Sequence, residues 1–278
     1  MRTKIILELC CNHQGSINIA KQMIDDAHLL GAWGVKLQKR DVEAIPDKLK
    51  NTTRSPLNSF GGTFYEHRKA LEFSVKQMLE LKEYIESKKM RSLVSVFDEL
   101  SAKQMLAVGY EYIKLPSQLY SNENLVKLIS DKTKKLIGST GMHTLNEISE
   151  FKYNDCYNIL FFCRSLYPCN LSEIKLGNFL KFKNIINKQT KKTKIGYSSH
   201  DIEGIGIKYA VLLGAEFIER HYTMDKTWIG SDHSTVSSDF EETQKIIKEI
   251  EYIETVVKIE SENLDESEKK IRLKYRGF

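Results

Sequence analysis

The chain has 278 residues, of which 41% are hydrophobic and 28% charged, and its formal net charge at pH 7 is +5. This composition is typical of a globular protein, and no apolar run approaches the roughly 18 residues of a membrane span. Basic and acidic residues alternate along the whole chain, which gives no sign of a nucleic-acid interface. The five cysteines lack zinc-ribbon spacing and the N-terminus runs directly into a strand-like segment, so we expect a reduced cytoplasmic protein.

Eight apolar segments rich in β-branched residues alternate with amphipathic segments. We predict strands at residues 4–9, 33–38, 91–97, 111–116, 134–140, 157–163, 193–199 and 216–222. Helical patterns lie between them, for example at 18–32, 74–89 and 203–215. Eight β/α repeats in a chain of this length predict an α/β fold, a single-domain (β/α)8 TIM barrel. An open doubly wound sheet is the alternative, but no GxGxxG follows the first strand.

Three segments depart from this repeat. Residues 40–73 form a long polar insertion after the second strand, which we expect to be a lid or a substrate loop, with disorder as the alternative. Residues 238–262 carry apolar side chains at helical spacing, which predicts a last helix packed on the barrel. We therefore expect the barrel to occupy residues 1–262 and a loose, charged tail to occupy residues 263–278.

Two histidines directly follow the short β-rich runs KIGYSS and FIER. His200 and His221 are too far apart for one helix, but their separation suits a strand, a crossover helix and the next strand. Both imidazoles would then lie at neighbouring strand ends, where they could hold a divalent metal. Two buried, hydrogen-bonded histidines are the alternative. Glu8 ends the first strand, which closes the barrel beside His221, and could contact the metal through water or hold a hydroxyl group or the attacking water.

Polar side chains mark the other strand ends. A lysine inside VKLQ or YIKLP is costly to bury unless it faces the barrel mouth and meets an anion. Lys36 and Lys114, with Ser117, Ser139 and Ser198 as hydrogen-bond donors, therefore predict a phosphate or carboxylate site, with structural ion pairs as the alternative. Further candidates at strand ends are Gln38, Ser95, Arg164, Ser165 and Tyr167. Together these residues favour metal-assisted chemistry on a phosphorylated or carboxylated small molecule.

Several linked motifs resemble the N-acetylneuraminate (sialic acid) synthases and related nonulosonate synthases. The opening ELCCNHQGSINIAKQMIDDAHLLGAWGVKLQ is similar to the start of that family. STGM (139–142), SLYP (165–168), GYSSHDIEGI (196–205) and ERHYTMDKTWIGSDH (219–233) resemble its later motifs, in the same order. The resemblance covers the chain up to the last helix.

The resemblance implies a condensation of phosphoenolpyruvate with an open-chain N-acetylated amino sugar, with release of phosphate. It implies that His200 and His221 bind Mn²⁺ or Mg²⁺, and that catalysis depends on these two residues with Glu8 and Lys114. The residues that it places around phosphoenolpyruvate are Lys36, Lys114, Ser117, Ser139 and Ser198. Those that it places around the sugar are Glu8, Gln38, Tyr167 and Asp232. A homodimer is possible, because the family is commonly dimeric.

The chain also departs from the family pattern. Leu119 stands where the family usually has an acidic residue, and FCRSLYP carries Phe162 and Arg164 as replacements in the pocket segment. The family usually continues into a C-terminal antifreeze-like domain that lends an arginine to the sugar, and we expect that arginine to be absent here, with Arg164 as a candidate substitute. Two other functions therefore stay open: an aldolase or lyase that forms a Schiff base through Lys36 or Lys114, and a non-catalytic sugar-binding descendant of a synthase.

Overall fold

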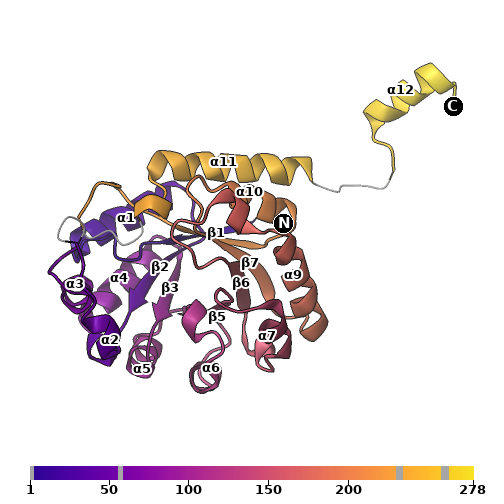
Figure 1. Cartoon of the computed structure of the whole chain (residues 1–278). Helices are drawn as coiled ribbons and strands as arrows, with labels where there is room; N and C mark the ends of the chain where they lie inside the picture. The colour runs from indigo at the N-terminus through magenta and orange to yellow at the C-terminus, as the bar shows by residue number, and fades with distance from the viewer. Residues whose placement is uncertain (1–2, 56–58, 230–233, 258–262) are drawn as a thin grey trace.

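The computed structural model describes residues 3–55, 59–229, 234–257 and 263–278. Eight parallel strands close into a barrel in chain order, with β8 paired to β1 (Figure 1). The strands are β1 (Lys4–Glu8), β2 (Gly34–Lys39), β3 (Arg91–Val96), β4 (Tyr112–Leu115), β5 (Leu136–Ser139), β6 (Ile159–Cys163), β7 (Lys194–Ser199) and β8 (Phe217–His221). The predicted TIM barrel is confirmed, and each predicted strand agrees with an observed one to within two residues at each end.

Helices surround the barrel and cover the outer face of the strands. They include α1 (Ile17–Leu29), α4 (Val75–Ser87), α5 (Glu99–Val108), α6 (Glu123–Ser130), α7 (Leu145–Glu150), α8 (Leu171–Ile174), α9 (Gly177–Gln189), α10 (Ile205–Leu212) and α11 (Phe240–Val256). Side chains that accept backbone N–H groups fix several helix starts, as Ser74 and Asp239 do in capping boxes. Gly109 ends α5 with φ of 82°, a backbone conformation that favours glycine.

Two apolar layers explain why the strands are apolar on both faces. The larger layer lies between the strands and the helices. A smaller one fills the inside of the barrel and consists of Ile6, Leu93, Ile137, Ile159, Phe161 and Phe217. Because side chains alternate along a strand, the next inward positions after these are polar. Five of them are Glu8, Ser95, Ser139, Cys163 and Glu219. These polar side chains therefore lie directly on the apolar layer inside the barrel, which excludes water.

The insertion at residues 40–73 contains regular structure. It forms the short turn η1 (Val42–Ala44) and two helices, α2 (Asp47–Lys50) and α3 (Phe64–Leu71). A capping box between Thr63 and Glu66 starts α3, and an isolated bridge joins Thr53 to Thr63. Leu71 of α3 packs with Cys10 and Cys11, which follow β1. Leu49, Phe64 and Arg68 line the barrel mouth, so the described part of the insertion is a folded wall of that mouth.

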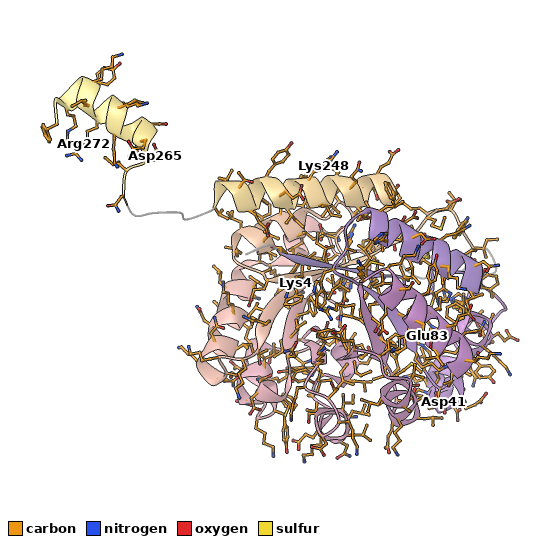
Figure 2. The ribbon with its side chains drawn as sticks, turned by 180° about the vertical axis from the view of Figure 1, so that it is seen from behind. Lys4, Asp41, Glu83, Lys248, Asp265 and Arg272 are labelled. Atoms are coloured by element: carbon orange, nitrogen blue, oxygen red, sulfur yellow. The ribbon has the colours of Figure 1, made fainter. Side chains whose placement is uncertain are left out.

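The chain ends in two helices of different character. Ile246, Ile247 and Ile250 of α11 are buried against the barrel, as its apolar spacing predicted. The tail contains α12 (Glu266–Arg276), a helix that the sequence analysis did not predict. Every residue of α12 is exposed, and the helix stands clear of the barrel (Figures 1 and 2). Within the described residues, no helix has the length and apolar character that a membrane crossing requires.

Candidate functional site

A cavity of about 250 Å³ opens at the carboxyl ends of the strands, where TIM barrels hold their ligands. Most of the residues expected from the sequence line it: Glu8, Lys36, Gln38, Ser95, Lys114, Ser117, Ser139, Ser165, Tyr167, Ser198, His200 and His221. Two others differ. Asp232 lies outside the described residues, and Arg164 is not part of the lining.

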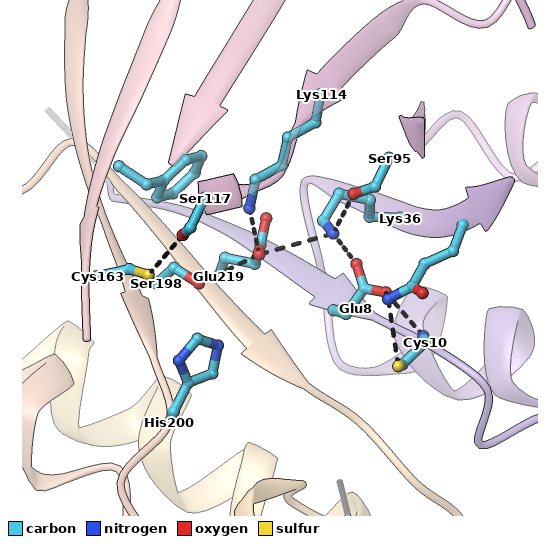
Figure 3. Close-up of polar contacts among 12 residues, drawn as sticks. Glu8, Cys10, Lys36, Ser95, Lys114, Ser117, Cys163, Ser198, His200 and Glu219 are labelled. Carbon is cyan, nitrogen blue, oxygen red and sulfur yellow. Dashed lines mark hydrogen bonds and ion pairs between the residues drawn. The ribbon is translucent and has the colours of Figure 1, made fainter. Parts of the chain in front are cut away.

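The floor of the cavity is a cluster of two lysines and two glutamates (Figure 3). Lys36 Nζ forms an ion pair with Glu8, lies 3.6 Å from Glu219 Oε1 and donates to Ser95 Oγ at 2.8 Å. Lys114 Nζ donates to Glu219 Oε1 at 2.6 Å and lies 4.9 Å from the centre of the Phe161 ring. Each of the four ionisable side chains is at most 4% exposed, so the charges compensate one another with little help from water.

Opposing effects set the protonation of this cluster. Burial favours the neutral carboxyl of Glu219, but Lys114 and Lys36 outweigh it and lower the pKa of Glu219 to about 2. Burial raises the pKa of Glu8, against the opposing charge of Lys36. Burial also lowers the pKa of Lys114, whereas the carboxylates of Glu219 and Glu8 overcome burial and raise the pKa of Lys36. Lys36 is therefore held as an ammonium, and Glu8 is the carboxyl that takes up a proton more readily.

A hydrogen-bond chain connects this floor to the mouth of the cavity. Gln38 Nε2 donates to Glu8 Oε1 at 3.1 Å, and Gln38 Oε1 accepts from Arg40 Nη2 at 2.8 Å. The backbone N–H of Cys10 also donates to Glu8 Oε1, at 2.9 Å. The Gln38 amide is thus held in one orientation, and Glu8 keeps its position through contacts from β1 and β2.

The two predicted metal ligands lie at the ends of adjacent strands, His200 directly after β7 and His221 as the last residue of β8, with their ring centres 5.5 Å apart. His200 Nδ1 is 2.7 Å from the backbone carbonyl oxygen of Arg164, so Nδ1 carries the proton and Nε2 is the lone-pair nitrogen. Tyr167 packs on both imidazoles: its ring centre lies 4.2 Å from that of His200 and 6.3 Å from that of His221. A histidine whose other nitrogen donates to a carbonyl is the usual arrangement of a metal ligand, so the His200 environment fits a divalent ion.

Few further metal-binding side chains surround this pair. In the described part of the chain, no three His, Cys, Asp or Glu side chains are grouped so that they could hold a metal ion. The pair itself lines the cavity beside Ser198 and Glu219. The described residues thus supply two imidazoles to such an ion, and catalytic metals commonly also take substrate or water oxygens as ligands.

Small side chains form a third wall of the cavity. Ser117 Oγ lies 3.4 Å from Cys163 Sγ, which in turn lies 3.8 Å from Ser165 Oγ. A Cβ atom added to Gly141 would come within 2.8 Å of all three side chains. This wall therefore requires glycine at position 141, and its hydroxyl groups can donate to an anion in the cavity.

Sequence reasoning did not select three charged residues that line the cavity. Glu219 was passed over, although it stands two positions before His221 and therefore points to the same side of β8. Arg40 directly follows β2, two positions after Gln38. Arg68 comes from α3, whose Leu71 packs with Cys10 and Cys11 after β1. Strand alternation could have revealed Glu219 and Arg40, but no local signal in the sequence marks Arg68.

The chain is similar in sequence to proteins of known family. The NeuB family model matches residues 23–261. N-acetylneuraminate-9-phosphate synthase of Drosophila melanogaster is 33% identical over 242 residues, which cover 82% of this chain and 62% of that protein. N,N'-diacetyllegionaminic acid synthase of Legionella pneumophila is 30% identical over 264 residues, or 91% of this chain and 72% of that protein.

A solved structure shows the same architecture. The crystal structure of N-acetylneuraminic acid synthetase from Leptospira borgpetersenii, in complex with citrate, superposes with a TM-score of 0.82. It is 27% identical to this chain, and the match covers 100% of this chain and 92% of the other. With a family match over most of its length and relatives of 30% identity or more, the chain belongs to the NeuB family.

Proposed function

We propose that this chain condenses phosphoenolpyruvate with an open-chain N-acetylated amino sugar to form a nonulosonic acid, with release of phosphate. The observation that carries the proposal is that one cavity holds both the lysine–glutamate cluster and the histidine pair. The names of the family relatives support the class of product. Those relatives are longer than the matched region, which spans 62% of the Drosophila protein.

The cluster suits the binding of a phosphorylated carboxylic acid. An ammonium group has three N–H donors, and those of Lys36 have Glu8, Ser95 and Glu219 as partners. Lys114 has one such partner, Glu219, among the described residues. Lys114 is therefore the lysine that can turn donors toward phosphoenolpyruvate, while Lys36 holds the two carboxylates in place. The hydroxyl groups of Ser117, Ser139 and Ser198 add neutral donors around the same space.

Glu8 is placed to exchange the proton that the reaction requires. Its carboxyl lines the cavity, and burial raises its pKa toward the range in which a carboxyl group both accepts and returns a proton. In the proposed role, Glu8 orients water or a sugar hydroxyl, and Gln38 keeps its oxygen fixed by donating to Oε1. Tyr167 covers the histidines and limits the entry of bulk water.

His200 and His221 would hold a divalent ion, Mn²⁺ or Mg²⁺. When bound, the ion would supply Lewis-acid polarisation of the sugar aldehyde. The fixed Nδ1 proton of His200 and the packing of Tyr167 keep the pair in one orientation. A homodimer and a cytoplasmic location stay predictions from the sequence.

A Schiff-base aldolase or lyase is the second candidate. Lys36 is poorly suited to it, because its carboxylate neighbours raise its pKa and hold it as an ammonium. Lys114 keeps the alternative open, since burial lowers its pKa. Reduction with borohydride in the presence of substrate separates the two: the condensation forms no covalent adduct on the chain.

The direct test is phosphate release from phosphoenolpyruvate with Mn²⁺ and a panel of N-acetylated amino sugars and simple aldoses. We expect sugar-dependent release that EDTA abolishes and Mn²⁺ restores. His200→Ala and His221→Ala should both remain folded and lose turnover. No release with any sugar would reject the proposed function, and full activity in metal-free buffer would reject the metal.

A further inference from the structure

Arg40 lies at the mouth of the cavity, directly after β2, and its guanidinium group is held from two sides. Nη2 donates to Gln38 Oε1 at 2.8 Å. The guanidinium carbon lies 3.7 Å from the centre of the Phe97 ring. A guanidinium group that stacks on an aromatic ring and also donates a hydrogen bond keeps few of its rotamers. Arg40 therefore meets Gln38 in a defined geometry.

The backbone of Arg40 is anchored as well. Its N–H donates to Glu72 Oε1 at 3.1 Å, and the same carboxylate oxygen accepts from Lys39 Nζ at 2.6 Å. Lys39 Nζ also donates to the backbone carbonyl oxygen of Phe73 at 2.8 Å. These contacts join the end of β2 to the segment that follows α3. The guanidinium group of Arg40 thus extends from a fixed backbone position, two residues after Gln38.

The other end of the Gln38 amide uses both of its hydrogens. Nε2 donates to Glu8 Oε1 at 3.1 Å and to Cys10 Sγ at 3.2 Å. An amide nitrogen has two N–H donors, so these two acceptors account for both. If the amide turned over, its oxygen would face the carboxylate of Glu8 and its nitrogen would face the guanidinium group. Acceptor would then meet acceptor at one end and donor would meet donor at the other.

Arg40 is the residue that holds the far end of this amide. A guanidinium group has five N–H donors and no acceptor, so it binds Oε1 and not Nε2. A glutamine side chain has three rotatable bonds, and a side chain of this kind loses up to about 2 kcal/mol of rotamer freedom when it is fixed. With both ends bound, Gln38 keeps one conformation. Without Arg40, the Oε1 end is released and the side chain regains conformations that turn away from Glu8.

We propose that Arg40 is a positioning residue for the condensation: it acts through Gln38 to keep the carboxylate of Glu8 directed into the cavity. This inference rests on the proposed function, in which Glu8 orients water or a sugar hydroxyl. Glu8 Oε1 accepts from Gln38 and from the backbone N–H of Cys10, and the carboxylate also pairs with Lys36. Gln38 is the member of this set that extends from the floor to the mouth, where Arg40 reaches it.

The test is a double-mutant cycle in the phosphate-release assay, with phosphoenolpyruvate, Mn²⁺ and the 2-acetamido-2-deoxyhexose that gives the fastest release. Arg40→Met should lower kcat at least about 10-fold, the size of a charged hydrogen bond, and leave both KM values within about twofold. In the Gln38→Leu background the same substitution should lower kcat by less than about twofold, because residues of one network do not act additively. Arg40→Lys keeps a donor for Gln38 and should lower kcat less; it replaces Arg40→Met if that variant fails to fold.

Arg91→Met is the matched control, because Arg91 begins β3 at the opposite end of the barrel, where it donates to Glu111 at 2.8 Å. It should keep the wild-type kcat. Equal losses from Arg40→Met with and without Gln38 would show that Arg40 does not act through Gln38 and would overturn the inference. An effect confined to KM would make Arg40 a substrate-binding residue and would also overturn it, as would a wild-type kcat in Arg40→Met.

Urea unfolding separates failure of this inference from failure of the proposed function, because it needs no turnover. If no sugar supports phosphate release, the condensation is rejected, and the link from Arg40 to Glu8 is still measurable. Arg40→Met and Glu8→Gln should be coupled by at least about 3-fold in the unfolding equilibrium constant, and Gln38→Leu should remove that coupling. Absence of coupling would overturn the inference. Coupling that persists without Gln38 would be a direct effect of charge and would overturn it too.

Discussion

Replacing Glu219 by glutamine removes one negative charge from the floor of the cavity and changes little else in shape. Glu219 Oε1 accepts from Lys114 at 2.6 Å, lies 3.6 Å from Lys36 and accepts from Ser198 Oγ at 3.2 Å. In the variant, Glu8 alone faces two buried ammonium groups. Breaking a buried ion pair in this way costs about 3–5 kcal/mol, because the remaining charge is desolvated and uncompensated.

The pH dependence of the variant's stability shows whether this cost comes from the charge of Lys114. Burial already lowers the pKa of Lys114, and loss of Glu219 removes the main charge that opposes this shift. A lysine whose folded pKa is lowered binds fewer protons in the folded chain than in the unfolded chain, so stability rises with pH up to the unfolded pKa of about 10.4. The variant should therefore recover part of its lost stability between neutral pH and about pH 9.5.

Urea unfolding followed by circular dichroism at pH 7 and pH 9.5 measures both effects. Glu216→Gln is the matched control: Glu216 lies just before the same strand and pairs with Lys194 at 3.1 Å on the surface, where a pair contributes about 1 kcal/mol or less. A loss below about 1 kcal/mol for Glu219→Gln, or a loss that stays constant with pH, would refute the idea that this cluster is charged and mutually compensating.

Four further predictions concern the floor, the packing around it and the tail. Lys114→Met should raise KM for phosphoenolpyruvate more than Lys36→Met does. Lys36→Met should lower the free energy of unfolding more, because Lys36 has more partners. Equal effects of the two substitutions on KM and on unfolding would contradict this. Gly196→Ala should cost about 1–3 kcal/mol, since its Cβ would lie 2.5 Å from the Phe161 ring, while Gly177→Ala, with no atom within 4 Å, should not; equal urea midpoints would count against the packing argument. Burial lowers the pKa of His13 to about 3, so stability should fall as pH drops from 6.5 toward 4, by up to about 1.4 kcal/mol per pH unit, and His13→Gln should flatten that slope. Deletion of residues 263–278 should leave the unfolding free energy within about 0.5 kcal/mol, and a larger change would show that α12 packs on the barrel in solution.

Much of the fold and of the floor could be predicted from the sequence because both depend on local patterns. A lysine within the strand segments VKLQ and YIKLP avoids the cost of burial only if it faces the barrel mouth. This rule placed Lys36 and Lys114 at the mouth, where both line the cavity. The histidines were found by their strand spacing. Glu219 has the same position in its strand as the two lysines have in theirs, so the same rule applies to it.

The rest depended on contacts between distant segments. Arg68 reaches the cavity because α3 packs on the segment after β1, where Arg68 donates to Cys11. Nothing within residues 40–73 shows which face of that helix meets the barrel. Arg164 stands at a strand end like the other candidates, but it contributes its backbone carbonyl to His200 and its side chain is not part of the lining. Such orientations follow from tertiary packing, which composition and periodicity do not encode.

The arrangement of charge in the cavity sets a requirement on what can bind there. Lys114 rests on Phe161 and is held by Glu219 above an apolar layer. A ligand that takes hydrogen bonds of Lys114 away from Glu219 must offset the positive charge of Lys114 at least as well as a carboxylate does. A neutral sugar cannot do so. The cluster on the floor therefore selects for a strongly anionic substrate.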